Sequence, residues 1–443
     1  MSHFHLRDGV LHCEDVPLPA IAEAVGTPVY VYSANAMRSQ ARALRAALAS
    51  LDDPLIAYAV KANPNIAVLS TLAREGLGAD VVSGGEYDRG RAAGISSDRI
   101  VFSGVGKTAH EMRRALAGGL AQFNLESFAE AEMLSAVATS MGRTAPVAFR
   151  VNPDVDAGTH AKISTGAAHN KFGIPISETL AACAALRDLP GLELKGLAVH
   201  IGSQLTSLAP LETAIVKLGT MIAELRSQGH AVQTADLGGG LGIPYDPSLP
   251  TPPTPADYGA MVTRLTRDWG VRLIFEPGRL IVGNAGVLVT EVIRIKPGPK
   301  CPFVIVDAAM NDLLRPTLYD AWHEIGAVAP KGGEMIADVV GPVCESGDIF
   351  ASARRMDRVG PGDLMAIRTA GAYAATMAGT YNSRPLAPEV LVDGADWAVV
   401  RPRRGDELFL ADEALPPWFS DEPLGAVESF PVGCKQPHRQ TGS

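Results

Sequence analysis

The sequence predicts a closed (β/α)8 TIM barrel joined to a second domain that consists mainly of β strands. Two observations favour this fold class. Eight short runs of β-forming residues alternate with helical patterns over about 220 residues, which is the rhythm of a barrel. After residue 283 the alternation stops, and five β-like runs follow with a single helix candidate among them. With 443 residues, 47% of them hydrophobic, the chain can bury the cores of two domains.

Each predicted barrel strand is a short run rich in apolar residues. Before the first strand, apolar residues between Met37 and Leu51 recur at the spacing of one helix face. After it, we expect Asn63 to cap a helix that has Pro64 as its first residue and Gly76 at its C-terminal end. A doubly wound open sheet is the alternative that this alternation leaves open. The predicted strands are residues 55–60, 79–83, 99–104, 121–125, 147–152, 194–201, 234–239 and 271–277.

The second domain is predicted from β-like runs that lack intervening helices. These runs are residues 287–296, 303–309, 335–340, 363–371 and 388–394, and the helix candidate is residues 312–322. The predicted domains are a barrel at 27–282, a β domain at 1–26 and 283–427, and a polar, unpatterned tail at 428–443.

Composition limits the classes of partner. A net charge of −9 argues against a nucleic acid or an anionic membrane surface. No apolar run approaches the roughly 20 residues of a membrane-spanning helix, and the polar N-terminal stretch is unlike a signal peptide. The cysteines are scattered without metal-ligand spacing, so we expect reduced thiols, no bound metal and a cytoplasmic protein. They are Cys13, Cys183, Cys301, Cys344 and Cys434.

The stretch YAVKAN places Lys61 at the end of a buried strand, where its neighbours offer no carboxylate. A lysine there either extends its amine into water or has a chemical role. In a barrel the chemistry lies at the carboxyl ends of the strands. Polar residues and glycines follow several other strands and would share this end with Lys61. They are Asp80, His200, Ser203, the turn 238–242 and the EPGR segment 276–279.

Each of these groups has an ordinary explanation and a functional one. Three consecutive glycines form a tight turn, or they direct backbone N–H groups toward a phosphate. Glu276 forms a salt bridge with Arg279, or it keeps a ring nitrogen protonated. His200 is a satisfied core histidine, or it stacks on an aromatic cofactor. Pyridoxal 5′-phosphate would use every functional alternative, with Lys61 bonded to its aldehyde carbon. Lys61 would then need no counter-ion, and its surroundings need only lower its pKa.

Six motifs in order, YAVKAN, HIGSQ, GGGLGI, EPGR, CESGD and GAY, resemble the barrel-type pyridoxal-phosphate decarboxylases of alanine racemase-like fold. Among these, the resemblance is to the diaminopimelate decarboxylases and covers roughly residues 20–420. It implies that Lys61 carries the cofactor, that His200 stacks on its ring, that Glu276 holds the ring nitrogen and that Ser203 binds the phosphate. The implied cofactor-binding residues are Lys61, Asp80, His200, Ser203, Gly238, Gly239, Gly240, Glu276, Pro277, Gly278, Arg279 and Tyr373.

The CESGD segment lies far in sequence from Lys61. A lone cysteine is usually a small buried hydrophobic residue, but acidic residues and glycines around Cys344 suggest an exposed loop. The resemblance implies that this loop reaches the active site of a neighbouring subunit, where Cys344 protonates the substrate carbon. The implied catalytic residues are therefore Lys61, His200 and Cys344, in a homodimer that shares its active sites.

The predicted substrate follows from charge. Diaminopimelate has a second amino-acid head, whose carboxylate calls for an extra guanidinium, and Arg315 with Tyr319 four residues later could supply one. A solvated helix arginine is the alternative. The implied substrate-binding residues are Arg279, Arg315, Tyr319, Glu345 and Tyr373. The predicted reaction converts meso-2,6-diaminopimelate to L-lysine and CO2. Alternatives are a decarboxylase for another basic amino acid or a carboxy-polyamine, a catalytically inactive homologue, and an unrelated phosphate-binding barrel.

Overall fold

The computed structural model describes residues 3–158, 160–163, 165–166, 170–405, 407–411, 413–416 and 418. The chain divides into a compact unit, Met1–Arg403, and a short unit, Arg404–Ser443, in which helix α12 spans Glu407–Ala411. The predicted tail at 428–443, with Cys434, lies outside the described residues. The predicted domain boundaries stay a prediction.

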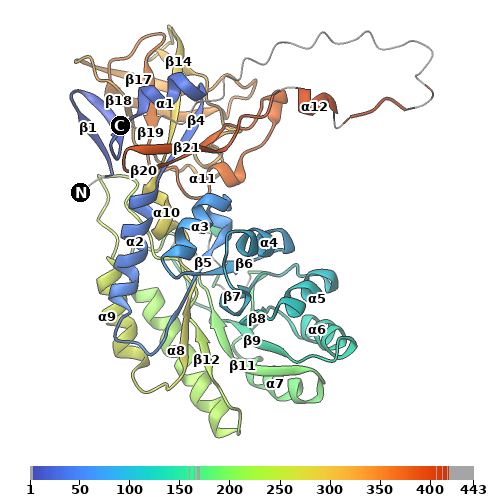
Figure 1. Cartoon of the computed structure of the whole chain (residues 1–443). Coiled ribbons are helices and arrows are strands. Elements are labelled where there is room, and N and C mark those ends of the chain that lie inside the picture. Colours follow the sequence, from blue (N-terminus) through green and yellow to red (C-terminus); the bar gives the residue numbers. More distant parts are fainter. Residues whose placement is uncertain are drawn as a thin grey trace, which may run out of the picture. The chain divides into compact units, whose positions relative to one another are not determined.

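Eight parallel strands close into a barrel, as predicted (Figure 1). The ladder is closed by two pairings: β13 pairs with β5 through Ile274 and Leu55, and β8 pairs with β9 through Phe123 and Val147. All eight predicted strands are confirmed, and the open-sheet alternative is excluded. In spatial order the strands are β5 (Leu55–Ala59), β6 (Gly78–Val81), β7 (Ile100–Phe102), β8 (Gln122–Leu125), β9 (Ala145–Asn152), β11 (Leu192–Val199), β12 (Thr234–Asp236) and β13 (Arg272–Phe275).

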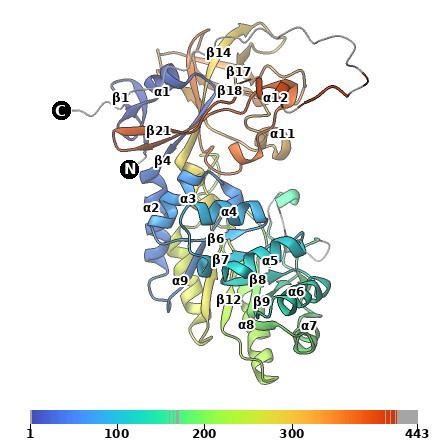
Figure 2. The same ribbon diagram turned by 45° about the vertical axis from the view of Figure 1, so that its right-hand side comes forward.

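Helices surround the strands, and the two views show this outer layer (Figures 1 and 2). Their apolar faces pack on the barrel, while Leu55, Ala57, Val101 and Ile274 form a separate buried cluster drawn from three strands. The helices are α2 (Ala34–Ala47), α3 (Ile66–Arg74), α4 (Gly84–Ala92), α5 (Ala109–Gly118), α6 (Phe128–Ser140), α7 (Thr179–Ala185), α8 (Ala209–Ser227), α9 (Pro255–Thr266) and α10 (Arg279–Val282), and a short strand β10 (Ile174–Pro175) extends the sheet beside β9.

The second part of the compact unit is built from β strands, as predicted. Strand β4 leads into α2, and β14 follows α10, so the barrel is attached through two adjacent antiparallel strands. Among the described residues this part has two sheets. The larger has the strand order β18-β17-β15-β14-β4-β20-β21 with β16 and β19 on a branch, and the smaller has the order β1-β2-β3. The strands are β1 (Phe4–Arg7), β2 (Val10–Cys13), β3 (Val16–Pro17), β4 (Val29–Ser33), β14 (Gly286–Lys296), β15 (Phe303–Val306), β16 (Ile325–Ala327), β17 (Glu334–Val340), β18 (Ile349–Asp357), β19 (Leu364–Ile367), β20 (Glu389–Asp393) and β21 (Asp396–Arg401), and the helices are α1 (Leu18–Val25) and α11 (Arg315–Tyr319).

Two predicted helices differ from the structure. The helix expected at 312–322 is only the five-residue α11, because Pro316 fixes its first turn and Asp320 ends it in the left-handed conformation. Helix α3 is capped by Asn65, not by Asn63, because Asn63 turns its side chain toward the carbonyl of Gly371 in the β domain.

Candidate active site

Every barrel strand contributes a polar residue at or just after its carboxyl end. Side chains alternate along a strand, so residues two apart face the same side. Ser103 and Glu276 stand two residues after the buried Val101 and Ile274, and both line a cavity of about 370 Å³. The eight residues are Lys61, Asp80, Ser103, Asn124, Arg150, His200, Asp236 and Glu276. Sequence reasoning named Lys61, Asp80, His200 and Glu276 and missed the other four, although the same two-residue spacing would have found them.

Lys61 has a counter-ion, which the sequence neighbours did not reveal. It lies in the 3-10 turn Val60–Ala62 after β5, and its Nζ atom is 2.5 Å from Oδ2 of Asp80. Burial is the largest single influence and opposes the charge of the lysine, but Asp80, Tyr373 and Glu276 together outweigh it and raise the pKa of Lys61. The expectation of an unpaired lysine with a lowered pKa was wrong, because β6 pairs beside β5 and brings Asp80 next to it.

His200 is a neutral imidazole in a fixed orientation. The backbone N–H of Gly239 donates to its Nδ1 at 3.1 Å, so a proton on the neutral ring sits on Nε2. Burial of the ring, together with the positive charges of Arg150 and Lys61, keeps the pKa of His200 well below its usual value. The ring therefore presents an uncharged flat face to the cavity that it lines with Lys61 and Glu276.

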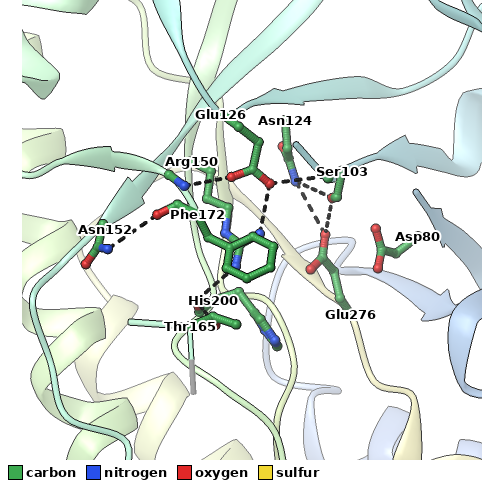
Figure 3. A network of polar contacts seen from close by, with 12 residues as sticks. Asp80, Ser103, Asn124, Glu126, Arg150, Asn152, Thr165, Phe172, His200 and Glu276 are labelled. Carbon is green, nitrogen blue, oxygen red and sulfur yellow. Dashed lines mark hydrogen bonds and ion pairs between the residues drawn. The ribbon is translucent and has the colours of Figure 1, made fainter. Parts of the chain in front are cut away.

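Glu276 belongs to a buried polar network at the barrel mouth (Figure 3). Its Oε1 atom accepts hydrogen bonds from Ser103 at 3.0 Å and Asn124 at 3.3 Å. Asn124 also donates to Oδ2 of Asp236 at 2.8 Å. Burial and the nearby carboxylates of Asp236 and Asp80 raise the pKa of Glu276 well above its usual value, and Glu276 shares a hydrogen bond with Asp236. Its buried position among carboxylates therefore favours the protonated form of Glu276, which lines the cavity.

A second network in the same view orients the wall beside His200. Arg150 donates to Glu126 at 2.9 Å and to the carbonyl of His200 at 3.3 Å, and its guanidinium lies 4.8 Å from the ring centroid of Phe172 (Figure 3). Thr165 donates to the same carbonyl at 2.8 Å. Two donors therefore hold the backbone from which the His200 side chain extends.

The glycine turn packs against two other strand ends. A Cβ atom on Gly239 would lie 2.1 Å from the carbonyl oxygen of Glu276, and one on Gly240 would lie 2.3 Å from that of Gly202. Gly240 also has a φ of +108°, a conformation that favours glycine. The turn therefore needs glycine for its own packing, whatever it binds. It lines a cavity with Lys61, Pro277 and Gly278.

Arg279 is buried beside this turn without a carboxylate partner in the part of the chain that the structure describes. It donates to Tyr245 at 2.6 Å and to Oγ of Ser203 at 3.1 Å, and its Nε atom has no partner. The alternative in which Arg279 forms a salt bridge with Glu276 is therefore excluded. A buried guanidinium with free donors attracts an anion.

Tyr373 closes the cavity from the β domain. Its φ of +54° is uncommon for a bulky residue and costs on the order of 1–3 kcal/mol, which points to a functional constraint. Its backbone N–H donates to the carbonyl of Ala62 at 2.8 Å, and its ring stacks on Arg279 at 4.8 Å. The GAY segment is thereby tied to the residue after Lys61.

These groups fit pyridoxal 5′-phosphate. The amine of Lys61 matches its aldehyde, the protonated carboxyl group of Glu276 matches a basic ring nitrogen, and the neutral face of His200 matches a planar ring. The unpartnered Nε of Arg279 marks an anion position near the glycine turn. Lys61, His200 and Glu276 line both of two adjoining cavities, and Arg279 lines one of them.

A neighbouring cavity of about 360 Å³ brings together three of the five residues predicted to bind substrate. Arg279 lines this cavity and also the cavity formed by Lys61 and the glycine turn. Arg315 and Tyr319 of α11 line the neighbouring cavity from the β domain. Arg315 is 6% exposed and has no carboxylate partner among the described residues. Tyr245, which sequence reasoning missed, packs its ring 4.4 Å from the Arg315 guanidinium. Tyr245 begins a Pro-rich stretch, residues 245–255, that contains none of the six motifs.

Cys344 and Glu345 do not join this site in the single chain. Cys344 is exposed, and its backbone N–H donates to Asn382 at 3.1 Å. Glu345 accepts from Tyr381 at 3.4 Å. Neither residue lines the two cavities that contain Lys61. The exposed loop is as predicted, and its role in a neighbouring subunit stays a prediction.

No helix among the described residues is long and apolar enough to cross a membrane. Residues 36–283 match the family model for the pyridoxal binding domain of pyridoxal-dependent decarboxylases. Diaminopimelate decarboxylase from Zymomonas mobilis is 55% identical to this chain, over 95% of this chain and all of the relative. The Pseudomonas aeruginosa enzyme of that name is 47% identical, over 94% of this chain and 100% of the relative.

Solved structures agree with these relatives. Diaminopimelate decarboxylase from Helicobacter pylori, complexed with L-lysine, is similar with a TM-score of 0.86 at 38% identity, over 90% of this chain and 100% of the other. The enzyme from M. jannaschii, also complexed with L-lysine, gives a TM-score of 0.90 at 34% identity, over 94% of this chain and 98% of the other. By its barrel, its site geometry and these relatives, the chain belongs to the pyridoxal-dependent decarboxylases, within the diaminopimelate decarboxylase family.

Proposed function

We propose that this protein decarboxylates meso-2,6-diaminopimelate to L-lysine and CO2. One observation carries the choice of substrate: Arg279 and Arg315 are two buried guanidinium groups on one cavity, and neither has a carboxylate partner among the described residues. Two uncompensated buried cations are costly unless a ligand neutralises them. A substrate with a second amino-acid head supplies a carboxylate to this cavity. An amino acid whose tail ends in a simple cation, such as ornithine, does not supply one.

Pyridoxal 5′-phosphate, when bound, supplies an electron sink for the electron pair that remains after CO2 leaves. Lys61 supplies the amine that attaches the cofactor, and Asp80 holds that amine in place at 2.5 Å. Glu276, whose pKa is raised by burial and by nearby carboxylates, would hold the ring nitrogen of the cofactor. His200 keeps a neutral ring in the cavity and adds no charge that would compete with Lys61.

Cys344 and Glu345 complete the proposed site from a second copy of the chain. In this proposal the Cys344 thiol donates a proton from Sγ to the substrate carbon, and Glu345 contacts the substrate. The exposure of the Cys344 loop supports this role, because an exposed thiol can reach a neighbouring subunit. The protein is then a homodimer with shared sites. A cytoplasmic location stays a prediction from the sequence.

The test is CO2 release from meso-diaminopimelate, L-lysine, L-ornithine and L-arginine by the cofactor-loaded enzyme. We expect turnover of meso-diaminopimelate and at least ~100-fold lower kcat/KM for the other three, because they leave Arg315 without its carboxylate. Turnover of ornithine or lysine in preference to meso-diaminopimelate would overturn the substrate. Arg315→Met should raise KM for meso-diaminopimelate, whereas the same change at the exposed Arg45 serves as the control.

A further inference from the structure

His323 is a buried histidine beside the substrate cavity that the reaction as proposed does not use. It follows α11 and is fully buried. Its Nδ1 atom lies 2.8 Å from the carbonyl oxygen of Arg368, and its Nε2 atom lies 2.8 Å from Nη1 of Arg315. A carbonyl oxygen only accepts hydrogen bonds, so Nδ1 carries the proton and Nε2 accepts from Arg315. The two bonds together fix both the tautomer and the ring.

The surroundings of His323 keep the ring uncharged. Burial and the positive charge of Arg315 lower the pKa of His323 to about 3, and Arg279 and Arg354 act in the same direction. The ring of Tyr245 packs edge-on at 5.3 Å. The hydrogen bond to the carbonyl of Arg368 acts in the opposite direction, and the neighbouring carboxylate of Glu324 pairs with the side chain of Arg368 at 3.7 Å. Because one ring nitrogen faces a carbonyl and the other faces an arginine donor, His323 is held as a neutral acceptor.

Arg315 is held between His323 and Tyr245. Its guanidinium lies 4.4 Å from the Tyr245 ring centroid, while Nη1 is occupied by His323. Its Nε atom is buried and has no partner among the described residues. The contacts thus fix the guanidinium plane and leave donor capacity for a ligand in the cavity that Arg315 lines.

The chemistry of the acceptor matters as much as its position. A carboxylate at this place would also orient Arg315, but it would cancel the positive charge that attracts an anionic group. A neutral imidazole orients the guanidinium and leaves its full charge available. We propose that His323 is a positioning residue that sets the selectivity of this site for ligands with a distal α-amino-acid carboxylate, an inference that rests on the proposed function.

Three substitutions separate orientation from charge. His323→Gln keeps a neutral acceptor, His323→Leu removes the acceptor, and His323→Glu supplies a charged one. The probes are L-lysine, which has the carboxylate, and cadaverine, which lacks it. We expect the Kd of L-lysine for the cofactor-loaded enzyme to rise about 10-fold in the Leu variant and further in the Glu variant. The Gln variant should stay within about 3-fold of the wild type, and cadaverine binding should not change in any variant.

Kinetics and a control variant complete the test. KM for meso-diaminopimelate should rise in parallel with the Kd of L-lysine, while kcat changes less than about 3-fold. His110→Leu, on the exposed surface of α5, should change neither. Equal losses for L-lysine and cadaverine, or a Glu variant that binds L-lysine as well as the Gln variant, would overturn the proposal. If the wild type fails to turn over meso-diaminopimelate, the proposed function falls instead.

A measurement on the unsubstituted enzyme covers the case in which the variants do not fold. Nitrogen-15 NMR of labelled histidine should assign His323 as the Nδ1–H tautomer, with no titration between about pH 5.5 and 9. The nitrogen shifts of Nε2 should move when L-lysine binds and stay unchanged with cadaverine. An Nε2–H tautomer, or a titration in that range, would refute the arrangement.

Discussion

Oδ2 of Asp80 lies 2.5 Å from Nζ of Lys61, and this ion pair joins adjacent barrel strands at the site of the proposed covalent attachment. This ion pair has two opposite effects on the amine of Lys61. It holds the amine in place, but it favours the protonated form, which is not nucleophilic. Loading of the cofactor therefore requires Lys61 to lose a proton against the field of Asp80.

Asp80→Asn should make that proton easier to lose. Burial then becomes the dominant influence on Lys61 and lowers its pKa, because the nearest carboxylate is gone. The rate at which apoprotein takes up pyridoxal 5′-phosphate, followed by absorbance, should reach its plateau at least about 1 pH unit lower than in the wild type. Asp88→Asn, which removes a surface ion pair with Arg114, is the matched control. An unchanged pH profile in the Asp80 variant would contradict this account.

The buried carboxyl pair of Asp236 and Glu276 should make the apoprotein less stable as pH rises. Burial raises the pKa of Asp236 to about 6 in the folded state, from an ordinary value of 3.8. The folded state therefore binds this proton more tightly than the unfolded state does. The stability that the proton confers is fully present below pH 3.8 and is lost as pH rises through about 6.

Asp236→Asn removes this contribution, together with the effect of the Asp236 charge on Glu276, because an amide does not titrate. Between pH 4 and pH 7, the wild type should lose on the order of 2 kcal/mol of unfolding free energy relative to the variant. Urea unfolding of the apoprotein at several pH values measures it. A difference that stays constant over this range would show that the pair does not share its proton as described.

The barrel could be predicted from sequence because its signals are local. Each of the eight strands is a buried apolar run, so short-range pattern identifies it. Strands β18 and β21 of the β domain were missed, because exposed residues such as Arg355 and Asp396 interrupt their apolar patterns. The cap of α3 was misplaced by two residues, because Asn63 has a long-range partner, Gly371, that no local pattern reveals.

The site residues also fall into two groups: those that a local motif identifies and those that only contacts between distant segments bring into the site. Lys61 and the glycine turn belong to motifs that sequence alone identifies. Asp236 and Asn124 do not, because their role depends on contacts between strands more than 100 residues apart, such as their 2.8 Å hydrogen bond. Asp80 was expected at the same end of the barrel as Lys61, but its ion pair with Lys61 was not predicted, because it depends on the pairing of β6 beside β5. His323 lies one residue beyond the predicted helix 312–322, so its contact with Arg315 was not predicted, although it stands four residues after Tyr319.

The glycine turn should tolerate no side chain at its centre. A Cβ atom on Gly239 would lie 2.1 Å from the Glu276 carbonyl oxygen, so Gly239→Ala must displace the turn or the end of β13. We expect a loss of at least ~2 kcal/mol in unfolding free energy, with weaker binding of the cofactor. Gly379→Ala is the control, because a Cβ atom there meets nothing within 4 Å. Equal melting temperatures for the two variants would contradict the packing argument.

Shared active sites predict complementation between two inactive variants. If Lys61 and Cys344 of one site come from different chains, a Lys61→Ala chain and a Cys344→Ala chain together form one intact site in each mixed dimer. Random reassociation after mild dissociation makes half of the dimers mixed, so activity should return to about a quarter of the wild-type value. Each variant alone should retain almost no activity. The measurement is CO2 release from meso-diaminopimelate before and after mixing.

The control for this experiment replaces a different cysteine. Cys301 is partly buried, and its thiol donates to Asp338 at 3.5 Å in the β domain. Cys301→Ala alone should therefore keep nearly full activity, which shows that loss of a thiol as such is harmless. Failure of the mixture to regain activity, with mixed dimers detected by native mass spectrometry, would place both residues in one chain or remove Cys344 from the reaction. A fully active Cys344→Ala variant would remove it outright, because no proton would then depend on its thiol.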